Sequence, residues 1–91
     1  MDTISELAKQ LLREADSSET GSIDIMYMLG NIHIQIGSSI AHDIDSNDEN
    51  VKNDLEFALK QMEKQHFVTS IGGTPKSYHI TDIGKKYVNS L

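Results

Sequence analysis

"SIGGTPKSYHIT", residues 70–81, contains the strongest turn signal in this sequence. It holds two adjacent glycines and the only proline in the chain. Segments rich in β-branched and aromatic residues, 67–71 and 77–81, flank the glycine-containing loop 72–76. Such runs on either side of a short loop are typical of two antiparallel strands. The stretch therefore predicts a β-hairpin.

The segment before the hairpin has the clearest helical pattern in the chain. Ser46 and Glu49 have the spacing of a capping box, and a helix is predicted over residues 47–65. Apolar residues then recur at helical spacing and are expected to form one buried stripe: Val51, Leu55, Ala58, Leu59 and Met62. The opposite face is expected to hold Asn50, Asn53, Phe57, Lys60 and Lys64.

Two further helices are predicted near the ends of the sequence. Thr3 and Glu6 form another capping box, and apolar residues at three- and four-residue spacing predict a helix over residues 3–15. After the hairpin, Thr81 begins a last short helix. This helix is expected to return three apolar side chains to the core: Ile83, Tyr87 and Val88.

The middle of the chain, residues 22–45, fits two patterns. Ile23, Ile25, Tyr27 and Leu29 alternate as in a strand, whereas Ile23 and Tyr27 also fit a helix together with Met26 and Ile34. Gly30 and Gly37 interrupt either pattern. We predict a short extended or helical piece at 22–29 and a helix near 38–44.

Length and composition indicate one globular domain, residues 1–91. The sequence is 37% hydrophobic and 24% charged, which is ordinary for a folded domain. No apolar run approaches the roughly 20 residues that span a bilayer, and the start of the chain lacks the pattern of a signal peptide. There is no cysteine, so neither a disulfide nor a thiolate metal site is possible. We expect a cytoplasmic protein without membrane contact.

The charge is acidic overall and uneven along the chain. The net charge is −6, and the segments 1–42, 43–64 and 65–91 carry −4, −4 and +2. An acidic surface repels the phosphates of nucleic acids. Any positive field is therefore expected at the carboxyl end, around Lys76, Lys85 and Lys86.

Two segments of the second half resemble the winged helix-turn-helix domain of MarR-like and PadR-like regulators. "LEFALKQMEKQHFV" is similar to the end of a recognition helix that runs into the first wing strand. "YHITDIGKKYV" is similar to the Tyr-x-Leu-Thr-x-x-Gly pattern that closes the wing. The resemblance implies an α+β, mainly α fold. Its parts would be three helices, a two-stranded hairpin wing and a short C-terminal helix.

Within this resemblance, "SSIAHDI" corresponds to the supporting helix, residues 47–65 to the recognition helix and 72–77 to the wing tip. The groove-facing residues would be Asn47, Asn50, Asn53 and Lys60, and the wing contacts would be Thr74, Lys76 and Ser77. The sequence departs from the family at two places. His66 stands where the family often has glycine, and four acidic residues accompany the recognition helix: Asp48, Glu49, Asp54 and Glu56.

These observations lead to two hypotheses about function. In the first, the protein is a transcriptional regulator that binds double-stranded DNA as a homodimer. In the second, it is an acidic winged-helix module for protein–protein interaction, for example a viral or mobile-element inhibitor or DNA mimic, that engages a basic partner. Phe57 either contacts a partner chain or is buried within its own chain.

The sequence contains no motif that indicates an enzyme or a cofactor. The histidines match no compact metal-ligand spacing, so no metal site is predicted: His33, His42, His66 and His79. No Gly-x-Ser-x-Gly frame or phosphate-binding loop is present either.

Overall fold

The computed structural model describes residues 4–72 and 76–91, and these form three helices and five strands. The helices are α1 (Glu6–Ser17), α2 (Glu49–Lys64) and α3 (Asp82–Asn89). The strands are β1 (Ser22–Met28), β2 (Asn31–Ile36), β3 (Ile40–Asp45), β4 (Val68–Ile71) and β5 (Lys76–Ile80). None of these helices is long and apolar enough to cross a membrane.

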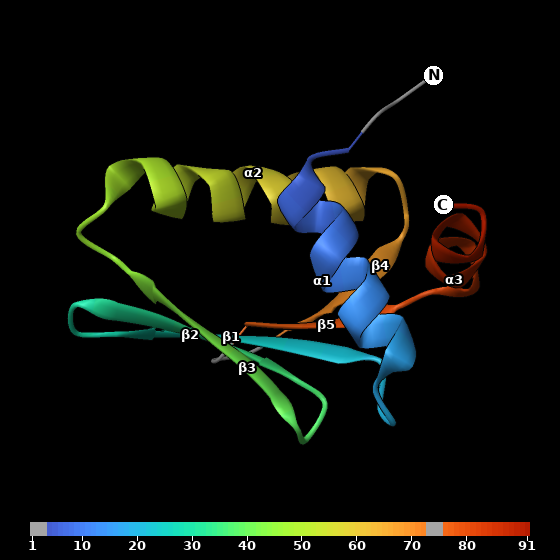
Figure 1. Ribbon diagram of the computed structural model, residues 1–91, viewed down its shortest axis with the longest axis horizontal. Helices are drawn as coiled ribbons and strands as arrows, with labels where there is room; N and C mark the ends of the chain where they lie inside the picture. The colour runs from blue at the N-terminus through green and yellow to red at the C-terminus, as the bar shows by residue number, and fades with distance from the viewer. Residues whose placement is uncertain (1–3, 73–75) are drawn as a thin grey trace.

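The five strands form one antiparallel sheet in the order β3-β2-β1-β5-β4, and α1 and α2 lie over one of its faces (Figure 1). The mainly helical winged helix-turn-helix fold expected from the sequence is therefore wrong. The error lies in residues 22–45, which form three strands and contain no helix. Alternate side chains of β1 and β2 are buried under the helices: Ile23, Ile25, Ile32, Ile34 and Ile36.

The strand pattern of this middle region depends on its two tight turns. Gly30 and Gly37 connect β1 to β2 and β2 to β3, with φ of 76° and 62°. Glycine adopts such angles without steric cost. Gly30 and Gly37, which were expected to interrupt the strand pattern, therefore form the turns between the strands. The segment near 38–44, which was expected to be a helix, forms β3 and pairs with β2.

The predicted long helix is confirmed as α2, with two corrections. Its N-cap is Asp48, whose carboxylate accepts the amide hydrogens of Asn50 and Val51, and Ser46 does not cap the helix. Four residues of the predicted stripe are buried: Leu55, Ala58, Leu59 and Met62. Val51 is 37% exposed because it precedes the part of α2 that packs fully on the core.

The predicted first helix is confirmed as α1 with shifted bounds. Ser5 is its N-cap and accepts a hydrogen bond from the Ala8 amide at 3.2 Å. The predicted capping residue Thr3 lies outside the described residues. The buried face of α1 consists of Ala8, Leu11, Leu12 and Ala15.

The predicted hairpin is present as β4 and β5, but it is not a free two-stranded wing. β5 pairs with β4 on one side and with β1 on the other, so the hairpin is part of the larger sheet. Residues 73–75 of the predicted loop lie outside the described residues. His66 ends the preceding turn with a φ of 62°, in the region that glycine prefers.

The last helix is confirmed as α3, capped by Thr81, which accepts a hydrogen bond from the Gly84 amide at 3.0 Å. Tyr87 stacks on Phe67, with ring centroids 4.4 Å apart. Ile83 was expected to reach the core but is 54% exposed, because it lies on the outer side of α3.

Candidate functional site

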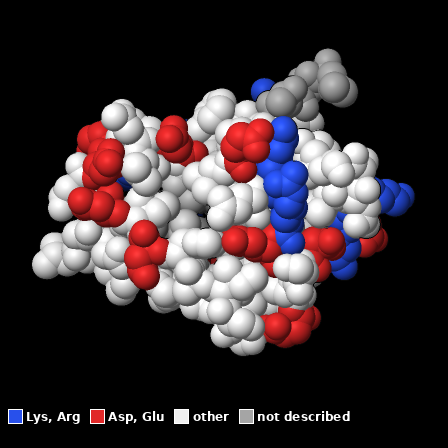
Figure 2. Space-filling model, viewed as in Figure 1, with Lys and Arg blue, Asp and Glu red and all other residues white. Residues whose placement is uncertain are grey.

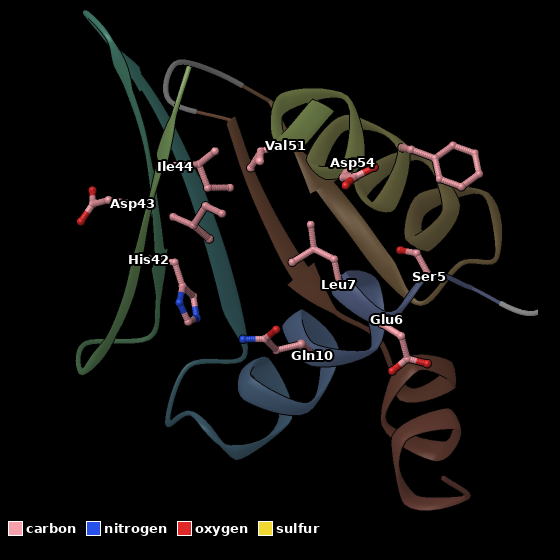
Figure 3. Close-up of a pocket in the computed structure, with 11 residues that line it drawn as sticks. Ser5, Glu6, Leu7, Gln10, His42, Asp43, Ile44, Val51 and Asp54 are labelled. Carbon is pink, nitrogen blue, oxygen red and sulfur yellow. The ribbon is translucent and has the colours of Figure 1, made fainter. Parts of the chain in front are cut away.

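A groove of about 580 Å³ lies between α1, α2 and β3 (Figure 3). Its apolar lining comes from these elements and from β2: Leu7, Ile34, Ile44, Val51 and Phe57. Val51 and Phe57 are 37% and 58% exposed. Exposed apolar side chains at the edge of a concave surface are typical of binding sites.

The alternation of β3 directs different side chains to the two faces of the sheet. His42 and Ile44 point toward the helices and line the groove. Asp43 also borders the groove, but its carboxylate points to the opposite, uncovered face (Figure 3). A strand places successive side chains on opposite sides, so this division follows from the sequence of β3. One strand thus presents an apolar surface to the groove and carboxylates to the other face.

Hydrogen bonds between elements hold the groove walls together. The Nε2 atom of His42 on β3 lies 2.7 Å from Oε1 of Glu14 on α1. The backbone amide of Ser5, which caps α1, donates to Oε1 of Gln61 on α2 at 2.9 Å. These contacts tie α1 to both other walls, so the groove has a defined shape.

The chain around the groove is strongly acidic. Residues 43–56 contain six Asp or Glu residues and one lysine, Lys52. Asp54 lines the groove and forms no ion pair with any described residue, and no lysine or arginine is among the lining residues. Acidic side chains gather over the start of α2, on the left of Figure 2.

The uncovered face of the sheet carries a hydrogen-bonded cluster. Nδ1 of His33 lies 2.9 Å from Oδ1 of Asp43, and Asn31 donates to the same oxygen at 3.0 Å. Nε2 of His33 lies 3.0 Å from Oε1 of Gln35, whose amide nitrogen donates to the Gly37 carbonyl. Both ring nitrogens of His33 thus face acceptors, which is the arrangement of an imidazolium ion.

The hydrogen bonds of this cluster shift the pKa values of His33 and Asp43 in opposite directions. The hydrogen bond to Asp43 and then the one to Gln35 raise the pKa of His33. The hydrogen bond from Asn31 and then the one from His33 lower the pKa of Asp43. Asp43 is therefore a fixed negative charge beside the edge of the sheet.

The residues that were predicted to contact DNA lie in two separate parts of the structure. Asn47, Asn50 and Asn53 are exposed at the start of α2, beside the acidic residues Asp48 and Glu49. The backbone amides of Asn47 and Asn50 donate to the side chains of Asp45 and Asp48. Thr74 lies outside the described residues.

Lys60 and Lys76 come together, in a second pocket of about 280 Å³. Glu56 and Glu63 line the same pocket, so its formal charges balance. The hydroxyl of Ser77 donates to Oδ1 of Asp24 at 2.5 Å. Lys60, Lys76 and Ser77, which were predicted to contact DNA, therefore lie beside acidic groups and apart from the asparagines.

Sequence reasoning found Phe57 but missed the rest of the groove. Val51 was expected in the buried stripe, and the segment that forms β3 was expected to be helical. The alternation of Ile40, His42 and Ile44 with Ala41 and Asp43 is the signal that identifies the strand. No local pattern connects this strand to Leu7 or Phe57.

Among residues 4–72 and 76–91, no cluster of three or more His, Asp or Glu side chains is arranged to hold a metal ion. Comparisons with protein-family models, curated proteins and solved structures find no match to this chain. The function is therefore argued from the geometry and charge of the site.

Proposed function

We propose that this protein is a protein-interaction module whose groove between α1, α2 and β3 binds an apolar segment of a partner protein flanked by lysine or arginine. The observation that carries the proposal is a solvent-exposed apolar groove surrounded by acidic residues. Leu7, Ile44, Val51 and Phe57 supply the apolar contacts. Burial of such side chains against a partner contributes roughly 25 cal/mol per Å² of apolar surface.

Charge determines the kind of partner that the groove favours. Asp54 is available at the groove, and Asp45, Asp48 and Glu49 lie in the same acidic stretch. A partner with the opposite charge associates faster and is preferred over an acidic competitor. The segment that binds is therefore expected to carry lysine or arginine beside its apolar residues.

The same observations disfavour DNA as the main ligand. The exposed asparagines of α2 lie within the acidic stretch, and phosphates are repelled by such a surface. Lys60 and Lys76 share their pocket with two glutamates. DNA binding by a regulator stays a prediction with a direct test, which is titration with duplex DNA at low salt.

The proposal is tested by NMR titration of the labelled protein with synthetic peptides of leucine and lysine. One peptide alternates the two residues, and the other places leucine at helical spacing. We expect at least one of them to shift the amide signals of Leu7, Ile44 and Val51. A peptide with glutamate in place of lysine is expected to bind about tenfold more weakly or not at all.

A matched pair of variants locates the binding. Phe57→Lys places a positive charge in the groove, whereas Ile83→Lys makes the same change at a site of similar exposure on α3. We expect about tenfold weaker peptide binding for Phe57→Lys and unchanged binding for Ile83→Lys. Equal loss in both variants, or no binding of either lysine peptide to the unaltered protein, contradicts the proposal.

Three other expectations stay predictions. Sedimentation of the purified protein tests whether it forms the predicted homodimer. The second is the cytoplasmic location expected from the sequence. The third is the absence of an enzymatic activity.

A further inference from the structure

β3 is an edge strand, and the direction of its backbone groups follows from the pairing with β2. The amide of Ser46, just after β3, donates to the carbonyl of Gly30 at 3.4 Å. In an antiparallel pair, the N–H and C=O groups of one residue both bond to the neighbouring strand, and those of the next residue both point to the other side. Ile44 and His42 therefore bond to β2, and the backbone groups of Asp43 and Ala41 point away from the sheet.

A second observation agrees with this assignment. The carbonyl of Asp45, two residues from Asp43, accepts a hydrogen bond from the amide of Asp48 and so also points away from β2. Among the described residues, no group outside the sheet forms a hydrogen bond with the backbone of Ala41 or Asp43. The edge of β3 is therefore open to another strand.

We infer that the partner segment binds in extended form, as a sixth strand beside β3 in the five-stranded sheet. This inference rests on the proposed function and specifies how the groove is used. Alternate side chains of the added strand would fall on the two faces of the sheet. One set would meet Ile44 and the groove, and the other would lie beside Asp43 and Asp45 on the uncovered face.

The partner is consequently a segment in which apolar and basic residues alternate. Cross-strand pairs of opposite charge stabilise a sheet, whereas like charges oppose pairing. A second copy of this chain is disfavoured as the occupant, because two adjacent β3 strands would bring Asp43 and Asp45 of both copies together. The other edge strand, β4, borders neither the groove nor the acidic stretch.

Proline at position 41 tests the strand directly. Ala41→Pro removes an amide that points away from β2, and proline is tolerated at such edge positions. Ala41→Ser is the matched control, because it keeps the amide at the same exposed site. We expect Ala41→Pro to bind the alternating leucine and lysine peptide at least about tenfold more weakly than Ala41→Ser.

A modified peptide provides a test that leaves the protein unaltered. N-methylation of alternate residues removes the donors that face β3 and keeps the charge and apolar side chains of the peptide. We expect methylation in this register to abolish binding and methylation in the other register to have a smaller effect. The amides of Ala41 and Asp43 are also expected to exchange hydrogen rapidly in the free protein and slowly with peptide bound.

The outcomes separate this inference from the proposed function. If the helically spaced peptide binds as well as the alternating one, and neither Ala41→Pro nor N-methylation weakens binding, strand addition is wrong while groove binding stands. If neither lysine peptide binds to the unaltered protein, both proposals fail. If Ala41→Pro does not fold, the methylated peptides and the hydrogen exchange decide the question.

Discussion

Gly84, in the first turn of α3, lies directly against the backbone of Phe67. A Cβ atom at this position would be 2.2 Å from the Phe67 carbonyl oxygen and 2.9 Å from Cγ1 of Ile80. Gly84→Ala is therefore expected to displace α3 and to lower the free energy of unfolding by about 1–3 kcal/mol. Gly72→Ala is the control, since among the described residues no atom outside its chain neighbours lies within 4 Å of its Cβ position, and a change within about 0.5 kcal/mol is expected. Equal values from urea denaturation of the two variants would contradict this packing.

His33 makes stability depend on pH near neutrality. The contacts with Asp43 and then Gln35 raise its pKa in the folded state, so protonation favours folding. This contribution is fully present below the ordinary histidine pKa of about 6.5 and is lost as the pH rises through the raised value. NMR titration should give an elevated pKa for His33 that falls toward the ordinary value in Asp43→Asn. Asp45→Asn, which leaves the His33 contacts intact, should not lower it comparably.

At the scale of the element, the start of α2 depends on Asp48. Its carboxylate accepts hydrogen bonds from the amides of Asn50 and Val51 and also lies favourably at the positive end of the helix dipole. Asp48→Ala is expected to lower the free energy of unfolding by about 1 kcal/mol. Ser46→Ala is expected to change it by less than about 0.5 kcal/mol. If thermal or urea denaturation showed a larger loss of stability for Ser46→Ala than for Asp48→Ala, Ser46 would be the capping residue, as the sequence had indicated.

At the scale of the whole molecule, the two halves of the chain depend on each other. β5 pairs with β1, and the fully buried Leu11, Ile23 and Ile25 belong to the first half. A fragment of residues 46–91 contains α2, the hairpin and α3 but lacks these partners. We expect it to be unfolded by circular dichroism and NMR under conditions in which the full chain is folded. A folded fragment with protected hairpin amides would show that the second half is an independent unit.

Elements whose hydrogen bonds and apolar pattern are local could be predicted from the amino-acid sequence alone. Each of these signals comes from residues that are close together in the sequence. They are the helical period of α2, the Thr81 cap of α3 and the turn signal between β4 and β5. These elements were predicted with small errors in their bounds and caps. Phe57 was also recognised as unusual, because a large aromatic side chain on a polar helix face is visible in the sequence alone.

By contrast, the three strands of residues 22–45 and the position of β1 between β2 and β5 depend on tertiary contacts. Short apolar runs fit both helical and strand periods, and the choice depends on pairing with segments that are distant in the chain. The groove also depends on contacts between segments that are distant in the sequence. Leu7, Ile44 and Val51 belong to three separate elements, and their exposure depends on how these elements pack, which no local pattern encodes.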